Sequence, residues 1–227
     1  MKKLILIIAV AAAAASCRIS DPQEPNQLNE QNISNYCRNL FEEEVSKNLI
    51  CLYNACQIAR FLDADAEAKV SPEFDLIRTG LSYNEDSYTF DYDDYSFSGE
   101  SSFLDEGVWK VIRSYYQELA IIVCPDKEWT ITVSNTGTVM KVKLVEEDAE
   151  TMKMSVRING IMTEDSEYSA GFEADSLEVT ICHKSAGKIE SMTYDGEMTV
   201  RFMENTRPRK TCVMEMIPGM ATSYAIM

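Results

Sequence analysis

The hydrophobic periodicity of this chain changes once, near Gly80, and that change limits the folds open to it. From Ile33 to Leu62, apolar residues recur at steps of three and four, without Gly or Pro. This spacing is typical of an amphipathic helix and predicts one long helix over about 33–62. After Gly80 the period becomes two and stays so, which indicates strands with one buried and one solvated face.

The alternating segments are separated by residues that favour tight turns. Asn159-Gly160 and Asp195-Gly196 predict two-residue hairpin turns, because both positions of each pair tolerate a positive φ. Slightly longer turns are predicted at 135–137 and 185–187. Strands joined this tightly must be antiparallel neighbours. The alternating segments are 88–92, 109–115, 121–123, 129–133, 140–144, 152–158, 177–181 and 198–202.

These patterns together predict an α+β fold. Its N-terminal amphipathic helix, over about 33–62, packs on an antiparallel β-meander of about eight to ten strands, which is open or a half-barrel. Ser71-Pro72-Glu73 and the stop at Gly80 predict a second, short helix over about 72–79. The helical segment 32–80 and the meander 81–227 are expected to form one globular unit.

The first 17 residues have the order of a secretory leader. Lys2 and Lys3 precede an apolar run, and the run ends in Ala14-Ala15-Ser16-Cys17. The last four residues resemble the lipobox of bacterial lipoproteins. The resemblance implies that residues 1–16 are a signal peptide and that Cys17 carries a diacylglycerol and palmitate. The alternative is an ordinary signal peptide with a chance cysteine.

Residues 17–31 read as the lipidated cysteine and a flexible tether, with two prolines and no aromatic residue. Such a coil would reach roughly 20 Å. We expect the protein to be lipid-anchored in the cell envelope, facing the periplasm or the cell surface. The whole chain resembles the small uncharacterised envelope lipoproteins of Gram-negative gut anaerobes, without a named domain family.

Six cysteines remain if Cys17 carries lipid, and an exported protein can pair them. Six cysteines allow 15 pairings. No two of the three helix cysteines can pair with each other, since in a continuous helix the first two lie about 21 Å apart. Any disulfide they form must therefore join helix and sheet; the alternative is free buried thiols. The six are Cys37, Cys51, Cys56, Cys124, Cys182 and Cys212.

Catalytic and metal-binding motifs are scarce in the sequence. The chain has one histidine, His183, which leaves no His-based zinc site and at most one Cys–His dyad. Cys182 is its neighbour, but adjacent residues of a strand point to opposite faces. No Gly-rich phosphate loop or CxxC pair occurs. We therefore expect no catalytic residue, no metal site and no cofactor.

The chain is strongly acidic, with a net charge of −16 that becomes −18 when the leader's two lysines are removed. Such a chain repels phosphate backbones, so nucleic acid is not an expected partner. The acidic, aromatic run 85–106 reads as an edge strand protected by charge, with a calcium loop as an alternative that its spacing does not fit. Surface aromatics could instead stack on a glycan if they point outward: Tyr88, Tyr92, Tyr95, Trp109 and Trp129.

Three functions from different classes remain open. The first is a membrane-anchored envelope lipoprotein that acts as a non-catalytic binding or structural module, with a glycan, protein or apolar small molecule as its unknown ligand. The second is a carrier or sensor of an apolar ligand held between helix and sheet, in a pocket lined by some of the 12 methionines. The third is a cysteine-dependent enzyme.

Overall fold

The computed structural model covers the whole chain. It describes residues 30–83, 87–92, 95–100, 108–113, 117–124, 128–133, 137–163, 168–183, 188–204 and 207–227. Within 83–127 it describes side chains only at 89, 90 and 98, and the side chains of 30, 161–163, 168–169, 204 and 207–209 are likewise not described.

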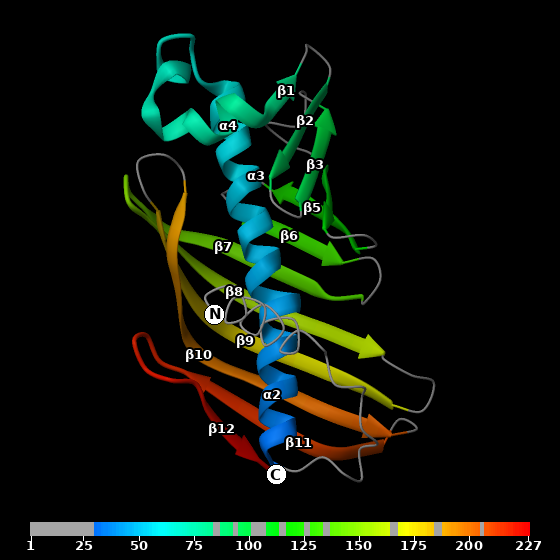
Figure 1. The fold of residues 1–227 in the computed structure, drawn as a ribbon. Helices are drawn as coiled ribbons and strands as arrows, with labels where there is room; N and C mark the ends of the chain where they lie inside the picture. The colour runs from blue at the N-terminus through cyan, green and yellow to red at the C-terminus, as the bar shows by residue number, and fades with distance from the viewer. Residues whose placement is uncertain are drawn as a thin grey trace, which may run out of the picture.

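A long helical rod runs the length of the molecule (Figure 1). It consists of α2 (Glu30–Phe41), a π-helical turn η2 (Glu42–Ser46) and α3 (Lys47–Asp63). The sequence predicts one uninterrupted α-helix here, whereas the structure inserts the π turn at three consecutive glutamates. Such single π turns leave the helix continuous while they change which side chains face the sheet below and above them.

Three short helical segments follow the rod: η3 (Ala68–Val70), η4 (Pro72–Phe74) and α4 (Asp75–Gly80). Pro72 opens the second of them, where a missing backbone N–H costs nothing, and α4 ends at Gly80. Phe74 and Ile77 are buried, and the Phe74 ring meets that of Phe61 edge-on. The segment thus packs back on the end of α3.

The strands form one sheet in sequence order, each antiparallel to the next, so that among the described residues β1 and β12 are its two edges. The α+β class and the antiparallel character of the sheet are confirmed. Over the described residues the sheet has twelve strands rather than eight to ten. The strands are β1 (Leu81–Tyr83), β2 (Ser87–Tyr92), β3 (Tyr95–Glu100), β4 (Val108–Arg113), β5 (Gln117–Cys124), β6 (Glu128–Val133), β7 (Val139–Glu147), β8 (Thr151–Thr163), β9 (Tyr168–His183), β10 (Ile189–Glu204), β11 (Arg207–Met216) and β12 (Ser223–Ile226).

Two predicted hairpin turns are wrong. Asn159-Gly160 lies inside β8, and Asp195-Gly196 lies inside β10. Each glycine lies within a long strand that continues on both sides of it. Gly160 pairs with Phe172 on β9, and a Cβ at Gly160 would come within 2.2 Å of that ring, so the phenyl group lies over the glycine.

Gly196 meets a different need. Its φ of +135° is one that L side chains rarely adopt, and its backbone lies beside the carbonyl of Ser176. The pairing of β10 with β9 shifts between Gly196 and Thr199, so the glycine marks a bulge. Further shifts interrupt β7 between Leu144 and Glu146 and β8 between Val156 and Ile158. Bulges bend a strand and increase its twist.

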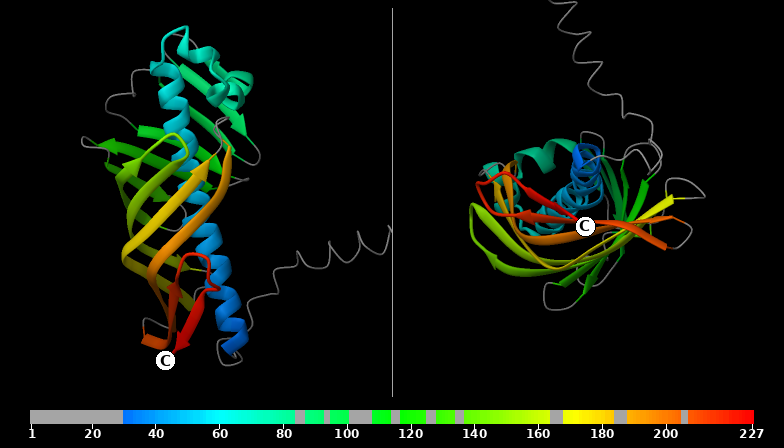
Figure 2. Two further views of the ribbon diagram at one scale, coloured as in Figure 1. Left: turned by 90° about the vertical axis from the view of Figure 1, so that its left-hand side faces the viewer. Right: turned by 90° about the horizontal axis from the view of Figure 1, so that it is seen from below.

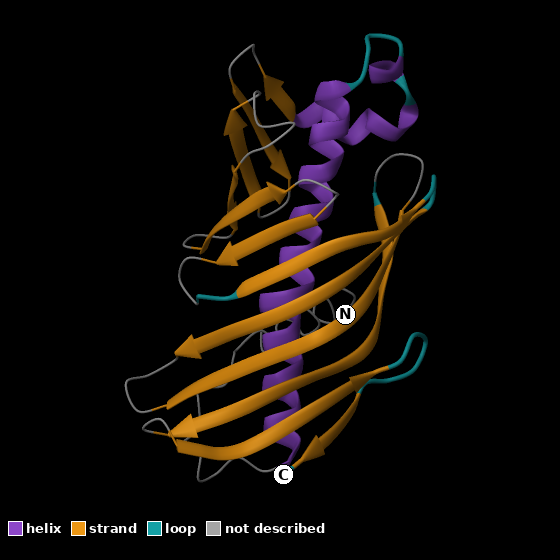
Figure 3. Ribbon diagram, turned by 180° about the vertical axis from the view of Figure 1, so that it is seen from behind, coloured by secondary structure: helices purple, strands orange, loops and turns teal. Residues whose placement is uncertain are grey.

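The bent sheet curls around the helical rod. Seen along its axis, the rod lies on the concave side, with the long strands β7 to β10 sweeping past it (Figure 2). From behind, the convex face of the sheet covers much of the rod (Figure 3). The concave side of the bent sheet is therefore occupied by a helix from the same chain.

Burial along the rod reflects this enclosure. α2 is one-sided, with Ile33, Cys37 and Leu40 buried and Arg38 exposed. In α3 every residue from Cys51 to Ala55 is buried, which a single apolar stripe could not produce. The sheet contributes alternate residues to the same core, as the period of two predicts: Ile131, Val133, Met140, Val142, Met152, Met154, Val156, Ile158, Leu177, Val179, Ile181, Met198, Val200, Cys212, Met214 and Met216.

The contact between Gly160 and Phe172 can be tested by adding one methyl group. We expect Gly160→Ala to lower the free energy of unfolding by about 2 kcal/mol, because the new Cβ overpacks a buried ring. Gly171→Ala, on the adjacent strand, is the matched control: its Cβ would meet nothing within 4 Å, and we expect a change below about 0.5 kcal/mol. Urea denaturation of both variants measures the difference. Equal effects would contradict the packing described for Phe172.

Candidate functional site

Buried polar side chains tie the π turn to the sheet on two sides. Glu44 is 1% exposed and accepts a hydrogen bond from the Thr138 hydroxyl, at 3.1 Å, where β7 begins. Tyr194 on β10 donates to the Ser46 hydroxyl at 2.7 Å. The Asn48 amide donates to the Glu44 carbonyl at 2.7 Å. The π turn is thus where the rod is fixed along the sheet.

Tyr194 is held firmly in this position. Its ring meets Phe41 edge-on, with centroids 4.8 Å apart. Burial raises the pKa of its hydroxyl to about 12, although the hydrogen bond with Ser46 acts in the opposite direction. The hydroxyl therefore stays protonated and remains a hydrogen-bond donor throughout the physiological pH range.

A second polar group lies further along α3. Tyr53 is fully buried, and its ring centroid lies 5.5 Å from that of His183 at the end of β9. Asn54 and Gln57 are also buried on the same helix. Among the described residues, no protein atom hydrogen-bonds Tyr53 Oη, Asn54 Nδ2, Gln57 Nε2 or His183 Nε2. Leaving such atoms unsatisfied costs roughly 1–3 kcal/mol each, so each of these groups is a candidate to bind a buried water.

The thiol of Cys56, on the same helix as Tyr53, is poorly suited to attack a substrate. Burial raises the pKa of Cys56 to about 12, despite the nearby Arg60 guanidinium, so the thiol remains protonated at neutral pH. Arg60 itself forms an ion pair with Glu147 at the end of β7. His183 is buried, while its neighbour Cys182 is only partly buried, as alternate faces of β9 require.

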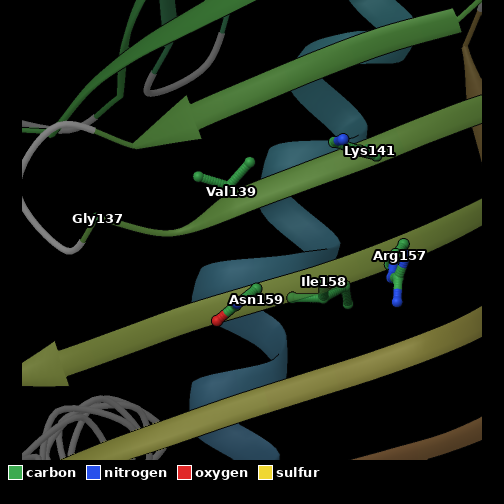
Figure 4. A pocket seen from close by; sticks show the side chains of 6 residues that line it. All are labelled: Gly137, Val139, Lys141, Arg157, Ile158 and Asn159. Atoms are coloured by element: carbon green, nitrogen blue, oxygen red, sulfur yellow. The ribbon is translucent and has the colours of Figure 1, made fainter.

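The convex face carries an open hollow of about 450 Å³ between β7 and β8 (Figure 4). Lys141 and Arg157 lie directly opposite each other on the two strands. Val139 and Asn159 form another such pair, two residues further along each strand. Lys141, Arg157 and Asn159 are exposed, on the side of the sheet away from the helical rod. The hollow is lined by Gly137, Val139, Lys141, Arg157, Ile158 and Asn159.

Charges on the convex face are mostly paired across strands. Lys153 pairs with Glu146 at 2.6 Å, and Arg201 with Glu173 at 2.5 Å, which lowers the pKa of Glu173. Within the part of the chain that the structure describes, Lys141 makes no ion pair. Two cations therefore stand side by side in the hollow of an acidic protein, where they can receive an anionic group.

Arg157 has one acidic neighbour. Its guanidinium lies 3.2 Å from a carboxylate oxygen of Asp175, at the β9 bulge. The Asp175 side chain is 94% exposed, and such a solvated pair contributes roughly 0–1 kcal/mol. A ligand carboxylate or phosphate could therefore replace Asp175 at little cost.

The residues that the sequence singles out do not gather at this hollow. Trp129 is partly buried and packs against the core, so its ring is not the outward platform that glycan stacking needs. Tyr88 and Tyr92 belong to β2, Tyr95 to β3 and Trp109 to β4, and their side chains lie outside the described residues. Cys17 also lies outside them.

In the part of the chain that the structure describes, five of the six cysteines form no disulfide: Cys37, Cys51, Cys56, Cys182 and Cys212. The side chain of Cys124 is not among those described. Over the described residues, no group of three His, Cys, Asp or Glu side chains is arranged to hold a metal ion. No helix in that part of the chain is long and apolar enough to cross a membrane.

Three comparisons with known proteins found no match. No protein-family model matches the chain, and neither does any curated protein or solved structure. Its function must therefore be inferred from its own residues.

Two tyrosine variants distinguish a satisfied hydroxyl from an unsatisfied one. We expect Tyr194→Phe to lower the free energy of unfolding by about 1 kcal/mol, since it removes the hydrogen bond with Ser46. Tyr53→Phe removes a buried hydroxyl without a protein partner, so we expect it to be neutral or slightly stabilising. Chemical denaturation compares the two. A loss above about 1 kcal/mol in Tyr53→Phe would mean that a bound water or ligand satisfies that hydroxyl.

Proposed function

We propose that this protein is a lipid-anchored lipoprotein of the cell envelope that acts as a non-catalytic binding or structural module. The leader and the Ala14-Ala15-Ser16-Cys17 sequence support the anchor. The observation that carries the binding role is the basic hollow on the convex face, in which Lys141 and Arg157 stand side by side.

The course of the chain favours this arrangement. The tether ends where α2 begins, at the end of the molecule that also holds β11 and β12 (Figure 1). A domain tethered there would stand with the rod leading away from the bilayer. We propose that the rod and the sheet behave as one rigid unit, because their side chains share one core. The convex face would then be free to meet a partner.

The other two functions place demands on the interior. A carrier of an apolar ligand needs space between helix and sheet, but buried side chains from both elements pack together along that interface. A cysteine-dependent enzyme needs a reactive thiolate, but burial raises the pKa of Cys56 on α3. Native mass spectrometry of protein purified from its own host would reveal a carried ligand by its mass.

The lipid anchor can be tested at Cys17. We expect Cys17→Ala to abolish incorporation of labelled palmitate and to move the protein out of the membrane fraction, because the lipobox resemblance assigns the diacylglycerol to Cys17. Cys182→Ala is the control and should keep both properties, since the residue lies far along the chain in β9. Wild-type protein that takes up no label, or label that persists in Cys17→Ala, would contradict lipidation at this position.

The basic hollow can be tested with a simple anion. We expect inorganic phosphate to shift the NMR signals of residues 139–141 and 157–159 in the wild-type protein. In Lys141→Gln/Arg157→Gln we expect the affinity to fall at least about tenfold, because both charged donors are gone. Lys143→Gln is the matched control, since Lys143 lies two residues away on β7 and is already paired with Glu128. Equal losses in both proteins would exclude the hollow as the anion site.

A further inference from the structure

The last 11 residues form a neutral and apolar surface on this acidic chain. The segment 217–227 has no charged side chain, although 26% of the whole chain is charged, and none of its residues is buried. Of the five large hydrophobic side chains that are exposed in the described part of the chain, three lie here: Ile217, Met220 and Met227. Exposed apolar groups gathered in one place are typical of a surface that meets a partner.

Strand β12, within this segment, has an open hydrogen-bonding edge. Over the described residues it pairs only with β11. The backbone N–H of Thr211 donates to the carbonyl of Met227 at 3.0 Å, and that of Met227 donates to the carbonyl of Thr211 at 2.8 Å. Hydrogen-bonded pairs alternate along an antiparallel ladder, so Ala225 is also bonded to β11. The N–H and C=O groups of Tyr224 and Ile226 therefore point toward the open side of the sheet.

The sequence of β12 leaves this edge accessible to pairing. Natural edge strands resist pairing with other chains through lysines, prolines, bulges or inward-pointing charges. β12 is short, but Ser223–Ile226 contains no lysine, proline or charge, and its pairing with β11 runs without a register shift. A row of open backbone N–H and C=O groups is best satisfied by another strand, which adds to the sheet. The chemistry of the edge therefore selects a strand as its occupant.

We propose that β12 pairs with β12 of a second copy of this chain, antiparallel to it and related by a two-fold axis. Within β12, one register uses all the open backbone groups of both copies. It places Tyr224 opposite Ile226 of the second copy, and Ile226 opposite Tyr224 of that copy. Ala225 then lies on the axis, opposite Ala225 of the second copy.

The side chains of β12 fit this register. Tyr224 and Ile226 are partly buried and pack against the core, and an aromatic ring opposite a β-branched side chain is a favourable cross-strand pair. Ala225 is exposed and small, which suits the axis, where the two copies come closest. A net charge of −16 makes two copies repel each other wherever their acidic surfaces meet, and the neutral segment 217–227 avoids this repulsion. The second copy is therefore the strand that this edge fits.

The pairing would extend the antiparallel meander from one copy into the next. The two-fold axis of such a self-pair is perpendicular to the sheet, so the convex faces of both copies lie on the same side. The two basic hollows would then face a partner together. The dimer itself requires neither the lipid anchor nor an anion in the hollow.

A cysteine placed on the axis tests the register directly. In the non-hydrogen-bonded pair at Ala225 the two Cα atoms lie about 4.5 Å apart, which a disulfide can bridge. We expect the purified full chain with Ala225→Cys to form a dimer on mild oxidation that reductant separates. Ser223→Cys is the matched control: it is exposed on the same face, but the two copies of residue 223 lie about 14 Å apart and should not link. Equal linking of both variants, or of neither, overturns the proposal.

Native mass spectrometry of the purified full chain counts the copies without a cross-link. We expect dimers for the wild-type chain, and we expect Ala225→Lys to raise the dimer dissociation constant at least about tenfold, because two ammonium groups then meet at the axis. Ala149→Lys makes the same change at an exposed turn between β7 and β8 and should leave the dimer intact. Circular dichroism confirms that both variants fold.

Two outcomes of this measurement overturn the proposal. In one, the wild-type chain stays monomeric at its highest soluble concentration, and the neutral segment would then face a bilayer or another protein. In the other, the dimer persists unchanged in folded Ala225→Lys, and the two copies would then meet through a different surface.

Discussion

The enclosure of one helix by one bent sheet is the constraint on which the rest of the structure depends. An α-helix satisfies its own backbone hydrogen bonds, so it can be surrounded on almost every side if its side chains are apolar. Ten of the 17 residues of α3 are buried, and seven of those ten are hydrophobic. The sheet must in turn be long and sharply bent, and the bulges in β7 to β10 supply the bend. The buried helix and the bulged strands therefore depend on each other, because the bend of the sheet is what encloses the helix.

An enclosed apolar rod could slide or rotate, because hydrophobic burial has no direction. The buried hydrogen bonds of Glu44 and Ser46 with Thr138 and Tyr194 oppose such movement. They join the rod to the start of β7 and to β10, which lie three strands apart in the sheet. Both hydrogen bonds form in only one alignment of the rod with the sheet, so the native register is favoured over its neighbours. The π turn presents both side chains toward the sheet within three residues.

Periodicity predicts much of this fold, and local turn chemistry misleads in two places. The apolar positions of β8, such as Met154 and Val156, are buried as alternation requires. Asn159-Gly160 reads as a turn because the sequence does not show that Phe172 needs an uncovered partner across the strands. The burial of Glu44 is equally hidden, since a run of three glutamates on a helix reads as solvated. Both depend on contacts between distant residues, which no local pattern encodes.

Local sequence patterns do not reveal the basic hollow for the same reason. The repulsion between its two cations makes it the surface that bears most directly on the proposed binding role. From the sequence, Lys141 and Arg157 are predicted only to lie on the solvent-exposed faces of two strands. The register of β7 with β8 places them directly opposite each other. Like charges directly opposite each other destabilise a strand pair by a few tenths of a kcal/mol or more. Lys143, Lys153 and Arg201 each pair with an acid on a neighbouring strand, whereas among the described residues Lys141 makes no ion pair. An arrangement that costs stability in the free protein would become favourable once an anion bridged the two cations, and this supports the proposal that the convex face is the binding surface.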